Sequence, residues 1–315
     1  SHAKKKCDVL ENAEAIDLLF EGKRVAGVKV KMANGTASDF FAKVVIGADG
    51  ASSLVARKTG AAKVDAAHSC SAVRGYYSGI KGLRGNIEIH FLPECMPGYF
   101  WIFPLSSHEA NVGVGMLLGD IMKRKLNLSS VLGKCLRNKK FAGRFADAKL
   151  EGETGGWTLP LASARRKCAG NGFVLLGDAA SLIDPFSGEG VGNGMKSASI
   201  AAGIIGQALA RGDVSEEDCL LYEKTLWQEI GPDVKSSHML QKLGKMPVLL
   251  DFVNGRAKSK EWIRKELAGM IANKEAPLFL QRGSPETAAP IREPRIGEQK
   301  GTGQKKSVRE KKAAD

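Results

Sequence analysis

One stretch of the chain combines an apolar run, an acid and alternate glycines, and it constrains the fold more than any other. The segment GFVLLGDAASLIDPFSGEGVGNGM covers residues 172–195, with Gly177-Asp178 at the end of the apolar run. Glycines then occupy every second position: Gly188, Gly190, Gly192 and Gly194. An acid at the carboxyl end of a buried strand, facing a helix start, can accept hydrogen bonds from ligand hydroxyls.

The alternate glycines remove every second Cβ from a loop that opens a helix. A flat ring can then lie against bare backbone, with the amides of the helix N-terminus directed at its electron-rich edge. The pyrimidine edge of an isoalloxazine ring suits this arrangement, and the hydroxyls of ribitol or ribose suit Asp178. A tight turn needed only for helix packing would explain one or two of the glycines, and this alternative stays open.

A second strand ends in the same way, because VVIGADG places Asp49-Gly50 after an apolar run. Upstream, residues 7–20 and 24–31 are predicted strands joined at Glu21-Gly22, residues 43–49 form a short apolar strand, and a helix is expected over 51–57. Helical patterns return after Gly194, in KSASIAAGIIGQALA, EEDCLLYEKTLWQEI and SKEWIRKELAGMIA. The sequence therefore predicts an α/β (α+β) chain.

The middle of the chain predicts a mostly antiparallel sheet. Its strand-like runs are SAVRGYYSGI, NIEIHFLP, YFWIFPL and ANVGVGML. Alternate side chains of a strand share a face, so Tyr99, Trp101 and Phe103 are expected on one side, with Pro104 ending the pairing. Three aromatic side chains on one face can wall an apolar tunnel, or they can be ordinary core beneath a helix.

The net charge of +13 is unevenly distributed. Residues 123–149 contain nine basic residues against one acid, Asp147. Aromatic residues are not interleaved with them as a nucleic-acid stacking platform requires, so no nucleic acid is expected. An anionic membrane surface or lipid headgroup fits this stretch, and a merely solvated helix face is the simplest alternative. Residues 282–315 are rich in Gly, Pro, Lys and Glu and predict a disordered basic tail.

The cysteines and the hydropathy indicate a cytoplasmic protein. The six cysteines lie far apart without a C-x-x-C pair, which predicts reduced thiols and no metal site. No apolar run approaches the roughly 18 to 20 residues of a membrane-spanning helix, and no apolar leader is present. Any contact with the inner face of the membrane is expected to be peripheral, through residues 123–149.

Several segments together resemble a known flavoprotein group. GADGASSLVAR (47–57) resembles the DG motif, and residues 172–195 resemble the GD motif, of flavoproteins with the p-hydroxybenzoate hydroxylase-like fold. PGYFWIFPLSSHEANVGVGM (97–116) and GGWTLPLASARRKCAGNGFVLLGD (155–178) resemble the geranylgeranyl reductase family of FAD-dependent oxidoreductases. The resemblance covers roughly residues 7–280.

The resemblance implies an FAD site, with Asp178 on the ribitol and the backbone of Gly190 and Val191 against the flavin pyrimidine. Gly177, Gly188 and Gly192 are implied in the same site. Asp49 and Gly50 are implied near the dinucleotide phosphates, and Ala15 on the adenine side. A role for Asp49 confined to capping the helix at Ala51 is the alternative. Tyr99, Trp101 and Phe103 are implied to line a substrate pocket between the flavin and the antiparallel sheet.

The chain departs from the family in one respect. Members begin with a strand and G-x-G-x-x-G, which lets the FAD pyrophosphate approach a helix N-terminus. The nearest match here, Gly113-Val114-Gly115 with Gly119, has the wrong spacing and reads as a strand with small residues. We therefore expect an amino-terminally truncated chain, lacking on the order of 100 residues, that holds half the cofactor site and is inactive alone.

The implied architecture is an incomplete Rossmann-like FAD-binding domain with an inserted antiparallel-sheet substrate domain and C-terminal helices. The expected parts are a partial FAD-binding domain at 1–66, the substrate domain with its basic helical stretch at 67–160, the return to the FAD-binding domain at 161–210, a helical region at 211–281 and the tail at 282–315.

The implied activity is reduction of isoprenoid double bonds of a prenyl-chain lipid by hydride from reduced flavin, with NAD(P)H or another reductant as electron donor. A flavin-dependent aromatic hydroxylase would share both motifs, and an inactive fragment or basic scaffold is the non-enzyme alternative. No residue is marked as the proton donor; Tyr76, Tyr77 and His90 are candidates because they lie in the expected substrate sheet.

Overall fold

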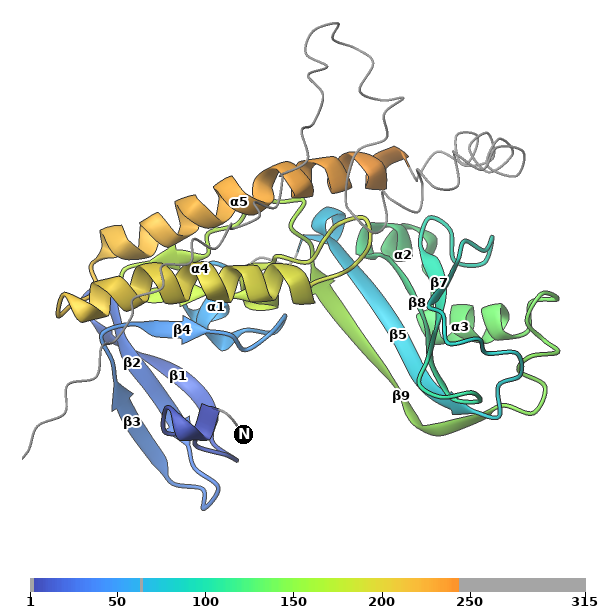
Figure 1. Ribbon diagram of the computed structural model, residues 1–315, viewed down its shortest axis with the longest axis horizontal. Helices are drawn as coiled ribbons and strands as arrows, with labels where there is room; N and C mark the ends of the chain where they lie inside the picture. Colours follow the sequence, from blue (N-terminus) through green and yellow to red (C-terminus); the bar gives the residue numbers. More distant parts are fainter. Residues whose placement is uncertain (1–2, 63–64, 244–315) are drawn as a thin grey trace, which may run out of the picture. The chain divides into compact units, whose positions relative to one another are not determined.

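The computed structural model describes residues 3–62 and 65–243, all within one compact unit (Figure 1). The strands are β1 Glu14–Glu21, β2 Arg24–Lys31, β3 Ala37–Phe41, β4 Val45–Gly47, β5 Ser69–Ser78, β6 Glu88–His90, β7 Tyr99–Pro104, β8 Ala110–Leu117, β9 Lys149–Pro160, β10 Ala169–Gly170 and β11 Phe173–Leu175. The helices are α1 Leu54–Lys58, α2 Leu118–Arg124, α3 Leu128–Leu136, α4 Val191–Ala210 and α5 Glu216–Leu243, with short 3-10 turns η1 Ala3–Lys5, η2 Ala66–His68 and η3 Gly177–Ala180.

The first sheet is an antiparallel meander in the order β1-β2-β3. The predicted hairpin at Glu21-Gly22 is confirmed, with Gly22 at a φ of +59° in the turn. The predicted strand over 7–20 begins later, at Glu14, because Asn12 adopts a left-handed φ of +56° that interrupts extended backbone. Leu18 and Val25 are buried in the core that this sheet shares with α4 and α5.

The second sheet, β10-β11-β4, brings the two acid-ended strands together. β11 pairs with β4 in parallel, with Leu175 opposite Gly47, so both strands end at the same edge of the sheet. The predicted helix over 51–57 begins three residues later, at Leu54, because Ser53 is its N-cap and accepts a hydrogen bond from the amide of Ala56.

Two long helices, α4 and α5, lie side by side over this sheet (Figure 1). The helix predicted over 216–230 continues to Leu243 through Pro232. Buried side chains recur at every fourth position of α5, at Tyr222, Leu226, Ile230 and Val234. This apolar stripe holds the helix against its neighbours on both sides of the proline and offsets the lost backbone hydrogen bond.

The third sheet is five-stranded and antiparallel throughout, in the order β6-β7-β8-β5-β9, which confirms the predicted antiparallel sheet. One face is core: Phe100, Ile102 and Val112 are fully buried against α3. The predicted basic helical stretch is two short helices, α2 and α3, separated by Lys125 in a left-handed conformation, and residues 137–148 form turns.

None of the helices in residues 3–62 and 65–243 is long and apolar enough to cross a membrane. The helix expected in SKEWIRKELAGMIA and the basic tail at 282–315 lie outside the described residues.

Candidate functional site

Asp178 lies in η3, immediately beyond the end of β11. Its carboxylate is half-buried and makes no hydrogen bond or ion pair with any residue that the structure describes. Burial raises the pKa of Asp178, and the nearby negative charge of Glu189 raises it further. An acid of this kind gains from a ligand hydroxyl that replaces the lost hydration.

The backbone of Gly190 borders the Asp178 carboxylate. A Cβ at Gly190 would lie 3.0 Å from Asp178 Oδ1 and 3.3 Å from Ile183 Cγ1, so a side chain there would press on the carboxylate. Gly177 and Gly188 have φ values of +54° and +74°, in the left-handed region that favours glycine. Gly177 and Gly188 are therefore required by the local backbone conformation, whether or not a ligand also needs the space beside them.

Helix α4 begins at this point, with Gly190 as its N-cap. Glu189 Oε1 accepts a hydrogen bond from the amide of Gly192, while the amides of Gly190 and Val191 donate to no group among the described residues. The Val191 side chain is 74% exposed. Two backbone donors at the positive end of a 20-residue helix thus face outward beside Asp178.

The loop before α4 is fixed by Asp184, at the start of a turn over residues 185–187. Asp184 Oδ1 accepts hydrogen bonds from the amides of Phe186 and Ser187 and from the Ser187 hydroxyl. The carbonyl oxygen of Ser187 in turn accepts a hydrogen bond from the hydroxyl of Tyr99 on β7. The glycine-rich loop is therefore tied to the five-stranded sheet.

Of three other residues predicted for the cofactor, Asp49 and Gly50 follow β4 at the sheet edge where β11 also ends, and Ala15 lies in another sheet. Asp49 Oδ2 accepts a hydrogen bond of 2.7 Å from the amide of Leu54, so Asp49 caps α1, and Gly50 has a φ of +74° in the turn between them. Ala15 is exposed on β1, opposite Val30, in a different sheet from β4. Roles for Asp49, Gly50 and Ala15 toward a dinucleotide stay predictions.

The aromatic side chains of β7 share one face of the sheet, as predicted. The ring centroids of Tyr99 and Trp101 are 5.9 Å apart, and those of Trp101 and Phe103 are 5.8 Å apart. Trp101 Nε1 donates a hydrogen bond to Asn111 Oδ1, and its indole lies so close over Gly113 that a Cβ there would overlap it. The glycines of Gly113-Val114-Gly115, which lie in a strand as predicted, thus leave space for the Trp101 ring. We call the side of the sheet that carries Tyr99, Trp101 and Phe103 the aromatic face.

The strand pairing separates the three proton-donor candidates. Tyr76 lies on the aromatic face, since it and Phe103 both pair with Asn111. His90 pairs with Phe100 and Tyr77 packs against Phe145, so these two lie on the opposite face of the sheet, away from the aromatic face. Alternation of side chains along each strand is the physical reason.

Sequence reasoning missed Cys70. Its pKa is raised to about 11, chiefly by burial, and the charge of Asp178 contributes to the increase. Burial also raises the pKa of Tyr99 to about 12, with Cys70 and Asp184 contributing. Cys70 packs against the cluster of Leu117, Leu161 and Ile183, and Ile183 in turn borders Gly190 of the glycine-rich loop. The position of Cys70 on β5, two residues before Ala72 on the same face, was the available signal.

Two arginines of the basic stretch, residues 123–149, make contacts within the protein. Both terminal nitrogens of Arg144 lie 2.7 Å from the carboxylate oxygens of Glu88. Arg124 donates a hydrogen bond to the carbonyl oxygen of Met96. The lysines Lys123, Lys125, Lys134, Lys139 and Lys140 are exposed.

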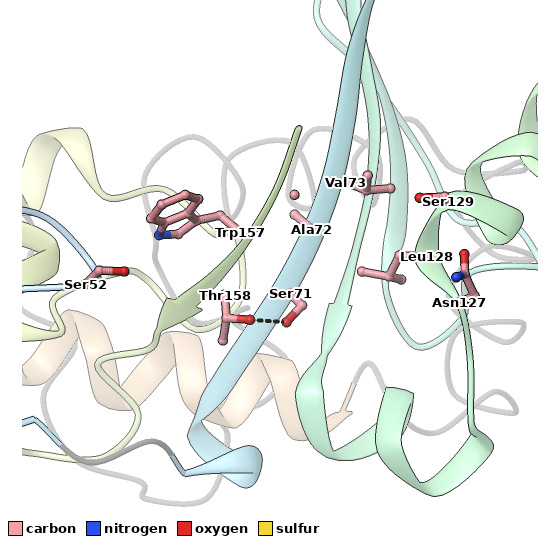
Figure 2. Close-up of a pocket in the computed structure, with 10 residues that line it drawn as sticks. Ser52, Ser71, Ala72, Val73, Asn127, Leu128, Ser129, Trp157 and Thr158 are labelled. Carbon is pink, nitrogen blue, oxygen red and sulfur yellow. Dashed lines mark hydrogen bonds between the residues drawn. The ribbon is translucent and has the colours of Figure 1, made fainter. Parts of the chain in front are cut away.

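A hollow of about 440 Å³ lies at the edge of the sheet formed by β5 and β9 (Figure 2). Figure 2 shows Trp157 on the side of β5 where Ser52 lies, and Leu128 and Asn127 on the other side. Ser71 and Thr158 share a hydrogen bond of 2.7 Å on its wall. Neither Asp178 nor Gly190 lines this hollow, so it is distinct from the candidate cofactor site. Among the described residues, no three His, Cys, Asp or Glu side chains gather as a metal site would need.

Comparison with curated proteins finds one enzyme name repeatedly. The chain is 33% identical over 231 residues to the digeranylgeranylglycerophospholipid reductase of Methanothrix thermoacetophila, covering 72% of this chain and 56% of that protein. It is 28% identical over 239 residues to digeranylgeranylglycerophospholipid reductase 1 of Methanococcoides burtonii, covering 75% and 56%. The chain thus spans little more than half the length of these relatives. No protein-family profile matches it.

Solved structures agree with this assignment. A geranylgeranyl bacteriochlorophyll reductase-like protein of Thermoplasma acidophilum superposes with a TM-score of 0.72 at 25% identity, covering 80% of this chain and 63% of that one. A myxobacterial chondrochloren halogenase, described as a variant of FAD-dependent halogenases, has a TM-score of 0.60 at 26% identity and covers 74% and 55%. By the sequence and structural likenesses together, the chain belongs to the geranylgeranyl reductase family of FAD-dependent oxidoreductases.

Proposed function

We propose that the chain binds FAD between Asp178 and the start of α4. The observation that carries this proposal is the half-buried Asp178 carboxylate, which has no partner among the described residues and lies against the bare backbone of Gly190. A carboxylate left in this state costs folding free energy unless a ligand uses it. A ribitol hydroxyl would donate to Asp178, and the amides of Gly190 and Val191 would face the flavin pyrimidine.

Bound FAD would supply hydride transfer. The role of the protein itself would be to position the flavin and the lipid chain and to exclude water. Tyr99 holds the glycine-rich loop against the sheet through Ser187, and the aromatic face presents rings on which an apolar chain can pack without unsatisfied polar groups. Cys70 and Tyr99 both keep their protons at neutral pH, because burial raises the pKa of each.

The proposed reaction is reduction of isoprenoid double bonds in a prenyl-chain lipid, with NAD(P)H or another reductant as the electron source. Support comes from the names of the relatives, which are reductases of digeranylgeranylglycerophospholipids, and from the aromatic face next to the candidate cofactor loop. Oxygen consumption coupled to an aromatic substrate would instead support the hydroxylase alternative.

Contact with a membrane surface is part of the same proposal. The exposed lysines of α2, α3 and the turns after α3 have no ion pair among the described residues. We expect cosedimentation with vesicles that contain anionic lipid, weakening as salt is added, and none with vesicles of neutral phosphatidylcholine. Binding that is equal for both vesicle types would contradict it.

The test of the cofactor proposal is a titration of the purified chain with FAD, followed by quenching of flavin fluorescence. We expect saturable binding that Asp178→Ala weakens by at least about tenfold, the value of a hydrogen bond to a charged group. The matched control is Asp213→Ala, which removes an exposed acid from the loop after α4 and should leave affinity unchanged. Equal affinity of wild type and Asp178→Ala would overturn the proposal.

A further inference from the structure

An arginine lies in the middle of the aromatic face. Arg74 is on β5, opposite Gly113 of β8 and Gly155 of β9. Because paired residues of neighbouring strands point to the same face, Arg74 shares the face that carries Trp101, the partner of Gly113 on β7. Arg74 is thus a single cation among aromatic and small side chains.

No acid neutralises this arginine. Its guanidinium lies 4.6 Å from the ring centroid of Tyr76 and makes neither an ion pair nor a hydrogen bond within the described part of the chain. Glu151, opposite Tyr76 on β9, instead accepts a hydrogen bond from the Ser78 hydroxyl. Tyr76 therefore holds the guanidinium by a cation–π contact and leaves its donors open.

Small and aromatic residues surround Arg74 on this face of the sheet. The small ones are Gly113, which the Trp101 indole covers, and Gly115, Ala72 and Gly155. The aromatic row of β7 borders one side, and Trp157, which pairs with Ala72 and is 58% exposed, borders the other. The strand geometry puts Arg74 about 12 Å from Tyr99, from two strand spacings of about 4.8 Å and two residues of about 3.3 Å.

We propose that Arg74 binds the phosphate headgroup of an amphiphilic lipid whose prenyl chain lies along the aromatic face toward Tyr99 and the glycine-rich loop. The inference rests on the proposed function and adds the headgroup class and the residue that selects it. Arginine offers a planar fork that matches phosphate oxygens, and the Arg74 guanidinium contacts the Tyr76 ring while its donors have no partner among the described residues. Aromatic and small side chains suit the apolar chain.

The test compares geranylgeranyl phosphate with geranylgeraniol, each presented in the same neutral detergent. Binding is followed by tryptophan fluorescence, since Trp101 and Trp157 both lie on this face. The variants are Arg74→Gln, Arg74→Lys and, as a control outside the basic stretch, Lys224→Gln on the exposed surface of α5. Thermal melts establish that each variant is folded, and inorganic phosphate is titrated alone.

We expect Arg74→Gln to weaken geranylgeranyl phosphate binding by about tenfold or more, with geranylgeraniol changed less than about twofold. Arg74→Lys should fall between, because it keeps the charge and loses the fork. Lys224→Gln should have no effect.

Equal losses for the phosphate and the alcohol in Arg74→Gln, or a loss in Lys224→Gln as large as in Arg74→Gln, would overturn the role of Arg74. Inorganic phosphate that binds as tightly as geranylgeranyl phosphate would also overturn it, because the site would then read free phosphate. If wild type binds neither lipid, the proposed prenyl-lipid substrate fails instead. If both lipids bind and Arg74→Gln changes neither affinity, the prenyl-lipid substrate is still supported and only the role of Arg74 is contradicted.

Discussion

The Tyr99 hydroxyl donates a hydrogen bond of 2.7 Å to the carbonyl oxygen of Ser187, across 88 residues of sequence. Tyr99 belongs to the aromatic face and Ser187 to the loop that opens α4, so one bond joins the candidate substrate surface to the candidate cofactor loop. A Cβ at Gly188 would lie 2.9 Å from the same hydroxyl oxygen, so glycine there permits the approach.

Replacing Tyr99 by phenylalanine should destabilise the chain by about 1 kcal/mol and lower its affinity for FAD, because the Ser187 carbonyl loses its donor and the loop loses its anchor. A thermal melt and a flavin titration measure the two effects. Tyr76→Phe is the matched control, since the Tyr76 hydroxyl has no hydrogen bond among the described residues and should be dispensable. Burial raises the pKa of Tyr99 to about 12, so the wild-type anchor should persist through pH 10. Identical melts for the two phenylalanine variants would argue against the anchor.

Gly190→Ala should weaken FAD binding by about tenfold or more, because the new methyl group would lie 3.0 Å from Asp178 Oδ1 and displace the carboxylate. Gly203→Ala provides the comparison in the same helix. A Cβ at Gly203 meets nothing, so this variant should keep the affinity and gain about 0.5–1 kcal/mol of stability. Unchanged FAD affinity in Gly190→Ala would show that the Asp178 carboxylate does not need its observed position.

Asp178→Asn should raise the melting temperature at neutral pH while it weakens FAD binding. Burial raises the folded-state pKa of Asp178 above the unfolded value of about 3.9, so the folded state holds the proton more tightly. Stability from this group is therefore fully present below the unfolded pKa and is lost as pH rises through the folded pKa. The gain from Asp178→Asn should shrink toward zero below about pH 4, measured as the difference in melting temperature between variant and wild type. A gain that is the same at pH 3.5 and pH 7 would contradict the titration of Asp178.

Cys70 should react slowly with iodoacetamide at pH 8 and more slowly still in the presence of FAD. Burial raises the pKa of its thiol to about 11, so roughly one molecule in a thousand carries the reactive thiolate at that pH. Peptide mass spectrometry can follow each site, with exposed Cys7 as the internal reference that FAD should not protect. Rapid labelling of Cys70, or equal protection of both cysteines by FAD, would mean that Cys70 does not lie near the cofactor.

Several features could be predicted because they depend on residues close in sequence. Alternation placed Tyr99, Trp101 and Phe103 on one face, and turn chemistry placed the hairpin at Gly22. The acid-ended strands were visible as apolar runs before Asp49 and Asp178. These signals are local, since period-two alternation and left-handed glycine need only the adjacent backbone.

What depends on distant residues was decided by the tertiary structure. The sequence did not predict that α5 continues past Pro232. That continuation depends on the packing of the buried stripe of α5 against neighbouring elements. The face of each candidate proton donor followed from strand register, which the sequence does not state. The sequence by itself determined the strands, turns and glycine-rich loop of this protein, because those arise from short-range backbone preferences. Only the tertiary structure decided that Tyr99 holds that loop, that Cys70 packs near it and that Arg74 has no acid partner among the described residues. Such pairings depend on how strands align across the sheet.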